Sequence, residues 1–122
     1  MPLVIRPATR TDIEAFSDMP DKPTIRAYVA EMDGKVIGMG GAALAKGRWY
    51  AFADLPEEIR PYKMTIMRNA RRFLEQMRRD GIRFIYAEAS PVEPKAVAWL
   101  TSLGFEVDQR SGGRLYRWRG NN

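Results

Sequence analysis

The sequence has 122 residues and contains neither cysteine nor histidine. This length corresponds to one domain, and we expect residues 1–122 to form a single domain. Without cysteine there is no disulfide, thiolate nucleophile or cysteine-held zinc, and without histidine there is no Ser-His-Asp triad or histidine-held metal. We therefore expect no metal, and any acid–base chemistry falls to Asp, Glu, Lys or Tyr.

The chain is basic, with a formal net charge of +5, and 15 of its 20 basic residues are arginine. This charge is compatible with a nucleic-acid partner or with a phosphorylated small molecule and does not choose between them. No apolar stretch approaches the roughly 18 residues of a membrane-spanning helix, so no membrane partner is expected. The first residues, Met1–Arg6, lack the basic lead and the apolar stretch of a signal peptide. The sequence thus predicts a cytoplasmic protein.

The first half of the chain reads as a strand, a short helix and three further strands. Leu3–Arg6 is the first strand, and Thr9 with Asp12 has the pattern of a capping box for a helix over residues 10–18. Met19–Pro23 is a loop. Tight turns at Asp33-Gly34 and Lys46-Gly47 then join three strands, which are Thr24–Met32, Lys35–Ala45 and Arg48–Leu55.

Two patterns within these strands predict how they pack. The strand Lys35–Ala45 contains Gly38, Gly40 and Gly41. Glycines inside a strand indicate a bulge or a close approach of two backbones. Alternation in the strand Arg48–Leu55 divides its side chains between the two faces of the sheet. One face receives Trp49, Ala51, Ala53 and Leu55, and the other receives Tyr50, Phe52 and Asp54.

The second half alternates helices and strands. After a loop at Pro56–Pro61, apolar residues at helical spacing predict a helix over Tyr62–Asp80, with Met64, Met67 and Met77 facing the sheet, and Gly81 ends it. The later elements are a strand at Ile82–Ala89, a helix at 91–103 with a Ser90–Glu93 capping box, and a hairpin of Phe105–Gln109 with Arg114–Trp118. The order β-α-β-β-β-α-β-α-β-β predicts an α+β fold with a mixed sheet.

This order and three local segments resemble the GNAT acyltransferase family. Ile5-Arg6-Pro7-Ala8-Thr9 is similar to its first strand and helix start, and Val29–Gly38, around Asp33-Gly34, is similar to its central hairpin. The third segment runs from Ser90-Pro91 to Leu103-Gly104-Phe105 and is similar to the late helix that ends in Leu-Gly-Phe. The resemblance implies a GNAT-like fold across nearly the whole chain.

The resemblance also implies an activity and a cosubstrate. Members of this family transfer an acyl group from a coenzyme A thioester, here acetyl-CoA, to an amine, which could be a small molecule or a protein. The cosubstrate lies between two splayed parallel strands, which correspond to Arg48–Leu55 and Ile82–Ala89, and its pyrophosphate sits where the next helix begins. The residues that match the cosubstrate site are Leu55, Arg60, Tyr62, Lys63, Met64, Thr65 and Arg68.

The sequence departs from the family pattern in three places. In the phosphate loop, Lys63 and Thr65 replace small residues, and Pro61 removes one N–H donor. Leu100 stands where the family often has the tyrosine that protonates the leaving thiolate. Glu93 stands at a family asparagine, and a capping role with Ser90 accounts for it better than a chemical role.

The catalytic candidates are Asp54, Glu88 and Tyr62. Asp54 lies where the family often places its general base, and Glu88 ends the other splayed strand, while the phenol of Tyr62 could donate a proton. A solvated strand end is the simpler explanation of Asp54, an arginine partner that of Glu88, and ordinary packing that of Tyr62.

The helix at 62–80 carries most of the net charge on its outer face, where Arg68, Arg71, Arg72, Arg78 and Arg79 accompany Glu75. Ion pairs such as Arg71–Glu75 and Glu75–Arg79 would neutralise part of this positive charge. Two alternatives to an acetyltransferase stay open: a GNAT-like binding or structural module without catalysis, of the kind that phages or prophages encode, and a nucleic-acid-binding domain. Nucleic acid ranks last because no aromatic residue interleaves with these arginines. Pairing of the terminal hairpin between subunits would allow an oligomer.

Overall fold

The computed structural model describes residues 3–16, 24–89 and 95–120, which form one seven-stranded sheet in the order β1-β2-β3-β4-β5-β7-β6. The strands are β1 (Val4–Pro7), β2 (Thr24–Met32), β3 (Lys35–Ala45), β4 (Arg48–Asp54), β5 (Phe84–Glu88), β6 (Glu106–Val107) and β7 (Leu115–Arg119). The helices are α1 (Arg10–Phe16), α2 (Lys63–Arg79) and α3 (Ala96–Ser102), with 3-10 segments η1 (Glu57–Tyr62) and η2 (Gln109–Ser111). The predicted α+β fold and element order are confirmed.

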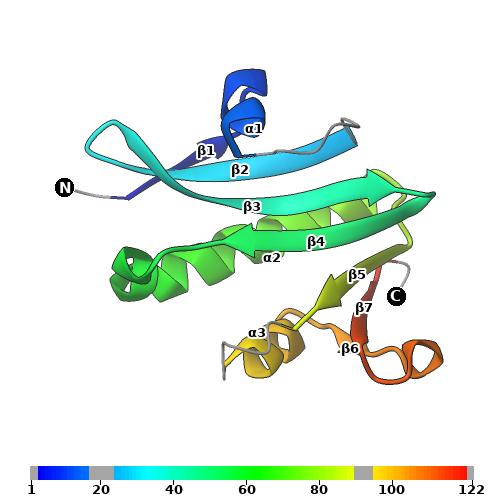
Figure 1. Ribbon diagram of the computed structural model, residues 1–122. Coiled ribbons are helices and arrows are strands. Elements are labelled where there is room, and N and C mark those ends of the chain that lie inside the picture. Colours follow the sequence, from blue (N-terminus) through cyan, green and yellow to red (C-terminus); the bar gives the residue numbers. More distant parts are fainter. Residues whose placement is uncertain (1–2, 17–23, 90–94, 121–122) are drawn as a thin grey trace.

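The direction of the strands singles out one pair. Every neighbouring pair in the sheet is antiparallel except β4 and β5, which run parallel. Parallel neighbours need a crossover connection, and η1 with α2 supplies it. Figure 1 shows α2 passing behind β3 and β4 before the chain enters the sheet again at β5.

The two faces of the sheet are covered differently. Leu74 and Met77 of α2 pack in one cluster with Ile85 of β5, and Leu100 of α3 belongs to the same cluster. Ile13 of α1 packs against Val29 and Met39, which belong to the opposite face. We refer to these as the α2 face and the α1 face.

The predicted alternation of β4 agrees with this division. Trp49 and Ala51 pack against the cluster under α2, and Phe52 packs against the cluster under α1. Because the side-chain period of a strand is two, Tyr50 and Asp54 belong with Phe52 to the α1 face.

The glycines of β3 make room for neighbouring backbone and side chains. A Cβ on Gly41 would lie 2.1 Å from the carbonyl oxygen of Arg26, and one on Gly38 would lie 2.8 Å from that of Asp54. The register between β2 and β3 also shifts by one residue beside Gly38. Both predicted reasons for glycine in this strand, a close approach and a bulge, are therefore present.

Most boundaries agree to within one residue, and the larger differences are in η1, β5 and β6. Residues 57–62 form the 3-10 helix η1 instead of a loop, because buried Ile59 anchors this turn and its N–H donates to the carbonyl of Pro56. Strand β5 begins two residues later than expected. Strand β6 has only two residues, because Asp108 caps η2 by accepting a hydrogen bond from the backbone N–H of Arg110. The predicted Met19–Pro23 loop and the Ser90–Glu93 capping box lie outside the described residues.

An ion-pair network ties the first strand to the first helix. Arg6 contacts Asp12 at 2.7 Å and Glu31 at 2.9 Å, so one guanidinium joins β1, α1 and β2. The backbone N–H of Thr9 donates to Asp12, and the backbone N–H of Asp12 donates to the Thr9 hydroxyl, which confirms the predicted capping box. The hydrogen bond from Arg6, helped by the one from Thr9, lowers the pKa of Asp12 below its usual range.

Within the described residues, no helix is both long and apolar enough to cross a membrane.

The tight contact at Gly41 predicts a stability difference between neighbouring glycines. Gly41→Ala should destabilise the fold by about 1–3 kcal/mol, because its methyl group meets rigid backbone. Gly40→Ala is the matched control, since a Cβ there finds no atom closer than 3.6 Å. Chemical denaturation measures both, and equal free energies of unfolding for the two variants would contradict this description of the β2–β3 contact.

The network around Arg6 predicts a pH dependence. A depressed pKa means that Asp12 adds stability above its unfolded pKa of about 4 and loses it as the pH falls through that value toward the folded pKa. Asp12→Asn should therefore lower the melting temperature near neutral pH and narrow the difference between neutral and acidic buffer. Glu14→Gln, which weakens an exposed i,i+4 pair with Arg10, serves as control. An unchanged pH profile in Asp12→Asn would show that the network does not stabilise the protein.

Candidate functional site

The parallel pair β4–β5 is joined over a very short length. Only Trp49 with Ile85 and Tyr50 with Tyr86 are in register, although β4 continues to Asp54 and β5 continues to Glu88. Beyond Tyr50 and Tyr86 the two strands diverge (Figure 1). The carboxyl ends of parallel strands lie at the same edge of a sheet, so the split opens toward the start of α2. The two strands expected to splay do so.

Two carboxylates border the split on the α1 face. The register of Tyr50 with Tyr86, together with alternation, assigns Asp54 and Glu88 to the same face as these two tyrosines. The tyrosine rings lie 6.0 Å apart. Asp54 and Glu88 are both exposed, and neither forms an ion pair with another described residue. The arrangement places two exposed carboxylates beside the split.

The segment between β4 and α2 is compact. The side chains of Leu55 and Ile59 each come within 3.3 Å of the position that a Cβ on Gly38 would take. The 3-10 helix η1 continues directly into α2, and the N–H of Lys63 donates to the carbonyl of Arg60. Because Pro61 has no N–H, this segment presents fewer free backbone donors than an open glycine loop.

The side chains at the start of α2 differ in exposure. Tyr62 is the half-buried N-cap residue, and Thr65 is also half-buried. Lys63 and Arg60 are exposed, and Arg60 makes a 3.6 Å contact with Glu57. Met64 is 72% exposed, so its expected place in the core is wrong, whereas Met67 and Met77 are buried as expected. Met64 begins the outer stripe of α2, one turn before Arg68.

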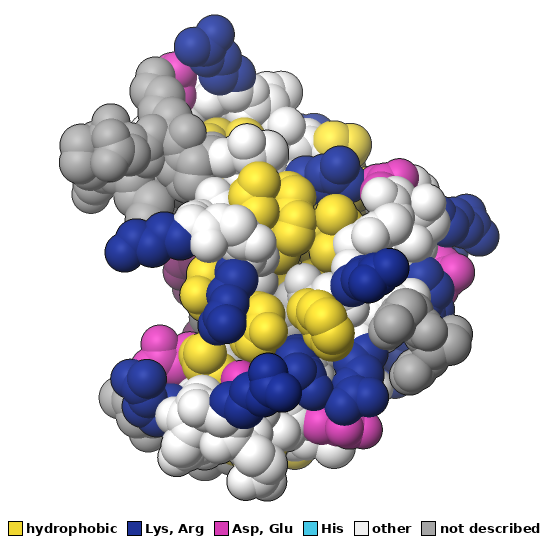
Figure 2. Space-filling model, turned by 90° about the vertical axis from the view of Figure 1, so that its right-hand side faces the viewer, with side chains coloured by type: hydrophobic (Ala, Val, Ile, Leu, Met, Phe, Trp, Pro, Cys, Tyr) yellow, Lys and Arg dark blue, Asp and Glu magenta, His cyan; other side chains and the backbone are white. Residues whose placement is uncertain are grey.

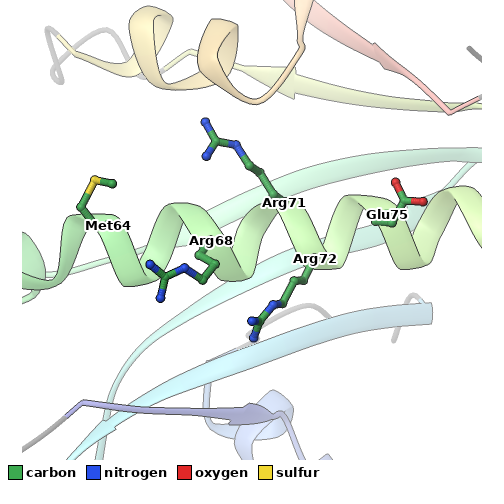
Figure 3. A pocket seen from close by; sticks show the side chains of 5 residues that line it. All are labelled: Met64, Arg68, Arg71, Arg72 and Glu75. Atoms are coloured by element: carbon green, nitrogen blue, oxygen red, sulfur yellow. The ribbon is translucent and has the colours of Figure 1, made fainter.

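The outer side of α2 has a shallow hollow lined by Met64, Arg68, Arg71, Arg72 and Glu75. Figure 3 shows Arg71 extending toward the side on which α3 lies, while Arg68 and Arg72 extend from the opposite side of the helix. Within the described residues, none of these three arginines forms an ion pair. The expected Arg71–Glu75 pair is absent, because Glu75 instead pairs with Arg78 and Arg79.

The structure brings the predicted residues together in two groups. Leu55, Arg60, Tyr62 and Lys63 lie on the short segment that leads from the split to α2, with Met64, Thr65 and Arg68 following on the first turns of the helix. Asp54 and Glu88 border the split itself. Leu100 is buried in the core under α2 and α3.

Two features were not anticipated from the sequence. The sequence predicts an ion pair of Arg71 with Glu75. Instead, Arg71 extends toward the side on which α3 lies, a direction that depends on how both helices pack on the sheet. The contact of Tyr50 with Tyr86 depends on the register of two parallel strands 36 residues apart, which alternation within each strand does not fix.

In the described part of the chain, no three Asp or Glu side chains gather in a group that could hold a metal ion.

Comparison by sequence found no match, either to a protein-family model or to a curated protein.

Comparison by structure found many. The chain is similar to a GNAT-family acetyltransferase from Staphylococcus aureus Mu50, with a TM-score of 0.70, 12% identity and coverage of 98% of this chain and 100% of that one. It is similar to the ribosomal-protein-S18-alanine N-acetyltransferase of Escherichia coli, with a TM-score of 0.66, 13% identity and coverage of 95% and 90%. A third similar structure is that of a protein from Bacillus anthracis Ames, assigned as a streptothricin acetyltransferase and solved in complex with acetyl coenzyme A. Its TM-score is 0.58, with 14% identity and coverage of 98% of this chain and 99% of that one.

These similarities extend over nearly the whole of each chain, and at 12–14% identity they concern the fold. The resemblance read from the sequence is therefore confirmed at that level: this chain has the fold of the GNAT acetyltransferases.

Proposed function

We propose that the protein binds acetyl-CoA in the split between β4 and β5 and transfers the acetyl group to the nitrogen of an amine. The observation that carries this proposal is the two-residue pairing of β4 with β5, which frees backbone N–H and C=O groups along the rest of both strands. Buried or half-buried backbone groups need partners. The amide-rich pantetheine arm of coenzyme A is a ligand that could supply them.

The phosphate groups of the cosubstrate would be held mainly by side chains. The N–H of Lys63 already donates to Arg60, and Pro61 has none, so the backbone offers less than an open glycine loop would. Lys63 and Arg71 compensate as cations, because both are exposed and neither has an ion-pair partner among the described residues. Arg60, Arg68 and the Thr65 hydroxyl stand close by in sequence, and Leu55 and Met64 offer apolar contact.

The acid–base roles fall to residues around the split. Acetyl-CoA would supply an activated acetyl thioester, and the amine must lose a proton to attack it. Asp54 is the proposed base, with Glu88 as the second carboxylate on the same face, and either could act through a water molecule. Tyr62, at the start of α2, is the proposed donor of the proton that the leaving sulfur requires.

Acetyl-CoA binding predicts a thermal shift. At about 100 times its dissociation constant, acetyl-CoA should stabilise the protein by about 2.7 kcal/mol. Lys63→Ala should reduce the shift, whereas Lys46→Ala, which removes the same charge at the turn on the opposite end of β4, should leave it intact. Absence of any shift at millimolar acetyl-CoA would overturn the proposal.

The base assignment predicts a loss of turnover without a loss of binding. Asp54→Asn should lower kcat/KM for an amine by about 100-fold or more, because a positioned base contributes about that much, and should keep the acetyl-CoA shift. Glu58→Gln, at an exposed position of η1, is the matched control. Normal turnover in Asp54→Asn together with loss in Glu88→Gln would move the base to β5.

The principal alternative is a module that binds acetyl-CoA or a partner without catalysis. Leu100 favours it, because this buried side chain cannot donate a proton where the family often has a tyrosine. A thermal shift with acetyl-CoA, combined with no acetylation across a panel of primary amines, would favour this alternative.

A further inference from the structure

A second surface lies on the α1 face, over the three adjacent strands β4, β5 and β7. Alternation and register assign six side chains to it, namely Arg48, Tyr50, Phe84, Tyr86, Arg117 and Arg119. We call this surface the arginine–aromatic face. The described helices do not pack on it, because α2 and α3 lie on the opposite side of the sheet and Ile13 of α1 packs over β2 and β3. Phe84 is 37% exposed and Tyr86 only 9%, so the face offers mainly guanidinium planes and the Phe84 ring to a ligand.

The arginines on this face lie against aromatic rings. The guanidinium of Arg48 lies 4.8 Å from the ring centre of Tyr86, and that of Arg117 lies 4.9 Å from the ring centre of Phe84. Tyr50 contacts Tyr86 from the neighbouring strand. These contacts hold the two cations over the sheet. A guanidinium that rests on a ring keeps its other side free to stack on a further planar group.

The charges on this face are available to an anion. Within the described residues, Arg48, Arg117 and Arg119 form no ion pairs. Glu106 is the register neighbour of Arg117 on β6, yet the two form none. Asp54 lies six residues beyond Arg48 on the same face, about 20 Å away at the rise of a strand. Figure 2 looks onto the end of the molecule at which β4 begins and shows exposed hydrophobic side chains with many Lys and Arg, and some Asp and Glu, around them.

We propose that the arginine–aromatic face binds single-stranded nucleic acid. Unpaired bases stack on aromatic rings and on guanidinium planes, and phosphates are attracted by the same arginines. Rings, stacked cations and a net positive charge on adjacent strands match a ligand that combines planar bases with phosphates. An acidic peptide would meet the cations and leave the rings unused. This proposal is independent of acetyl-CoA binding.

The face also changes the ranking of nucleic acid among the partners. On α2, neither Arg71 nor Arg72 stacks on an aromatic ring of another described residue. The sequence ranks nucleic acid last because no aromatic residue interleaves with the arginines of this helix. On the sheet, Arg48, Tyr86 and Arg117 come from three strands that meet only in the fold. The two surfaces carry similar charge and differ in aromatic content, so they can be compared within one protein.

The test measures fluorescence anisotropy of labelled oligo(dT) and oligo(rU) of about 12 nucleotides. Arg48→Ala/Arg117→Ala should weaken binding at least about fivefold and reduce the salt dependence of the affinity. Arg71→Ala/Arg72→Ala removes the same charge from α2 and should weaken binding much less. Duplex DNA of the same length should bind more weakly than the single strand.

A conservative pair separates stacking from charge and guards against misfolding. Arg48→Lys/Arg117→Lys keeps the charge and loses the planar group, so it should retain the salt dependence and still weaken binding. Thermal melts establish that each variant is folded. Three results would overturn the proposal: no binding of either oligonucleotide at low salt, equal losses in the two alanine pairs, or full affinity in the lysine pair. A larger loss in Arg71→Ala/Arg72→Ala would assign the interaction to α2.

Discussion

The short parallel pairing of β4 with β5 is the constraint on which the rest of the molecule depends. Two register pairs join an antiparallel unit of β1–β4 to a second unit of β5, β7 and β6. Ile85, which no solvent reaches, and Trp49 hold this junction from the α2 face, and Tyr50 with Tyr86 holds it from the other. The two units therefore form one sheet, but β4 and β5 separate beyond Tyr50 and Tyr86.

This single junction places two different chemistries on the α1 face. Toward the carboxyl ends of the strands lie the split, Asp54 and Glu88, with the start of α2 beside them. Toward the opposite ends lie Arg48 and Arg117 on their aromatic rings. Tyr86 takes part in both, since it closes the junction and carries the guanidinium of Arg48. An acidic end and a basic end thus share one face on the two sides of the junction.

Local sequence signals predicted the elements well, because turn glycines, the Thr9–Asp12 capping box and helical spacing act over a few residues. They also predicted which strands splay, through the family resemblance. They gave wrong predictions where tertiary packing sets the environment of a side chain. Met64 matches the apolar spacing of α2 but lies beyond the edge of the core, and Glu75 forms its ion pair with Arg78 and not with Arg71. The Arg48–Tyr86 and Arg117–Phe84 contacts could not be predicted from the sequence, because they depend on the relative register of β4, β5 and β7.

The central claim is that the split between β4 and β5 is a ligand site. Amide hydrogen exchange, measured residue by residue with and without acetyl-CoA, tests it most directly. The account predicts that acetyl-CoA slows exchange in β4 beyond Tyr50 and at the start of α2, while the β1–β2 pair stays unchanged. Slower exchange only in the part of α2 that carries Arg68, Arg71 and Arg72, or no change in exchange at any residue, would contradict this claim.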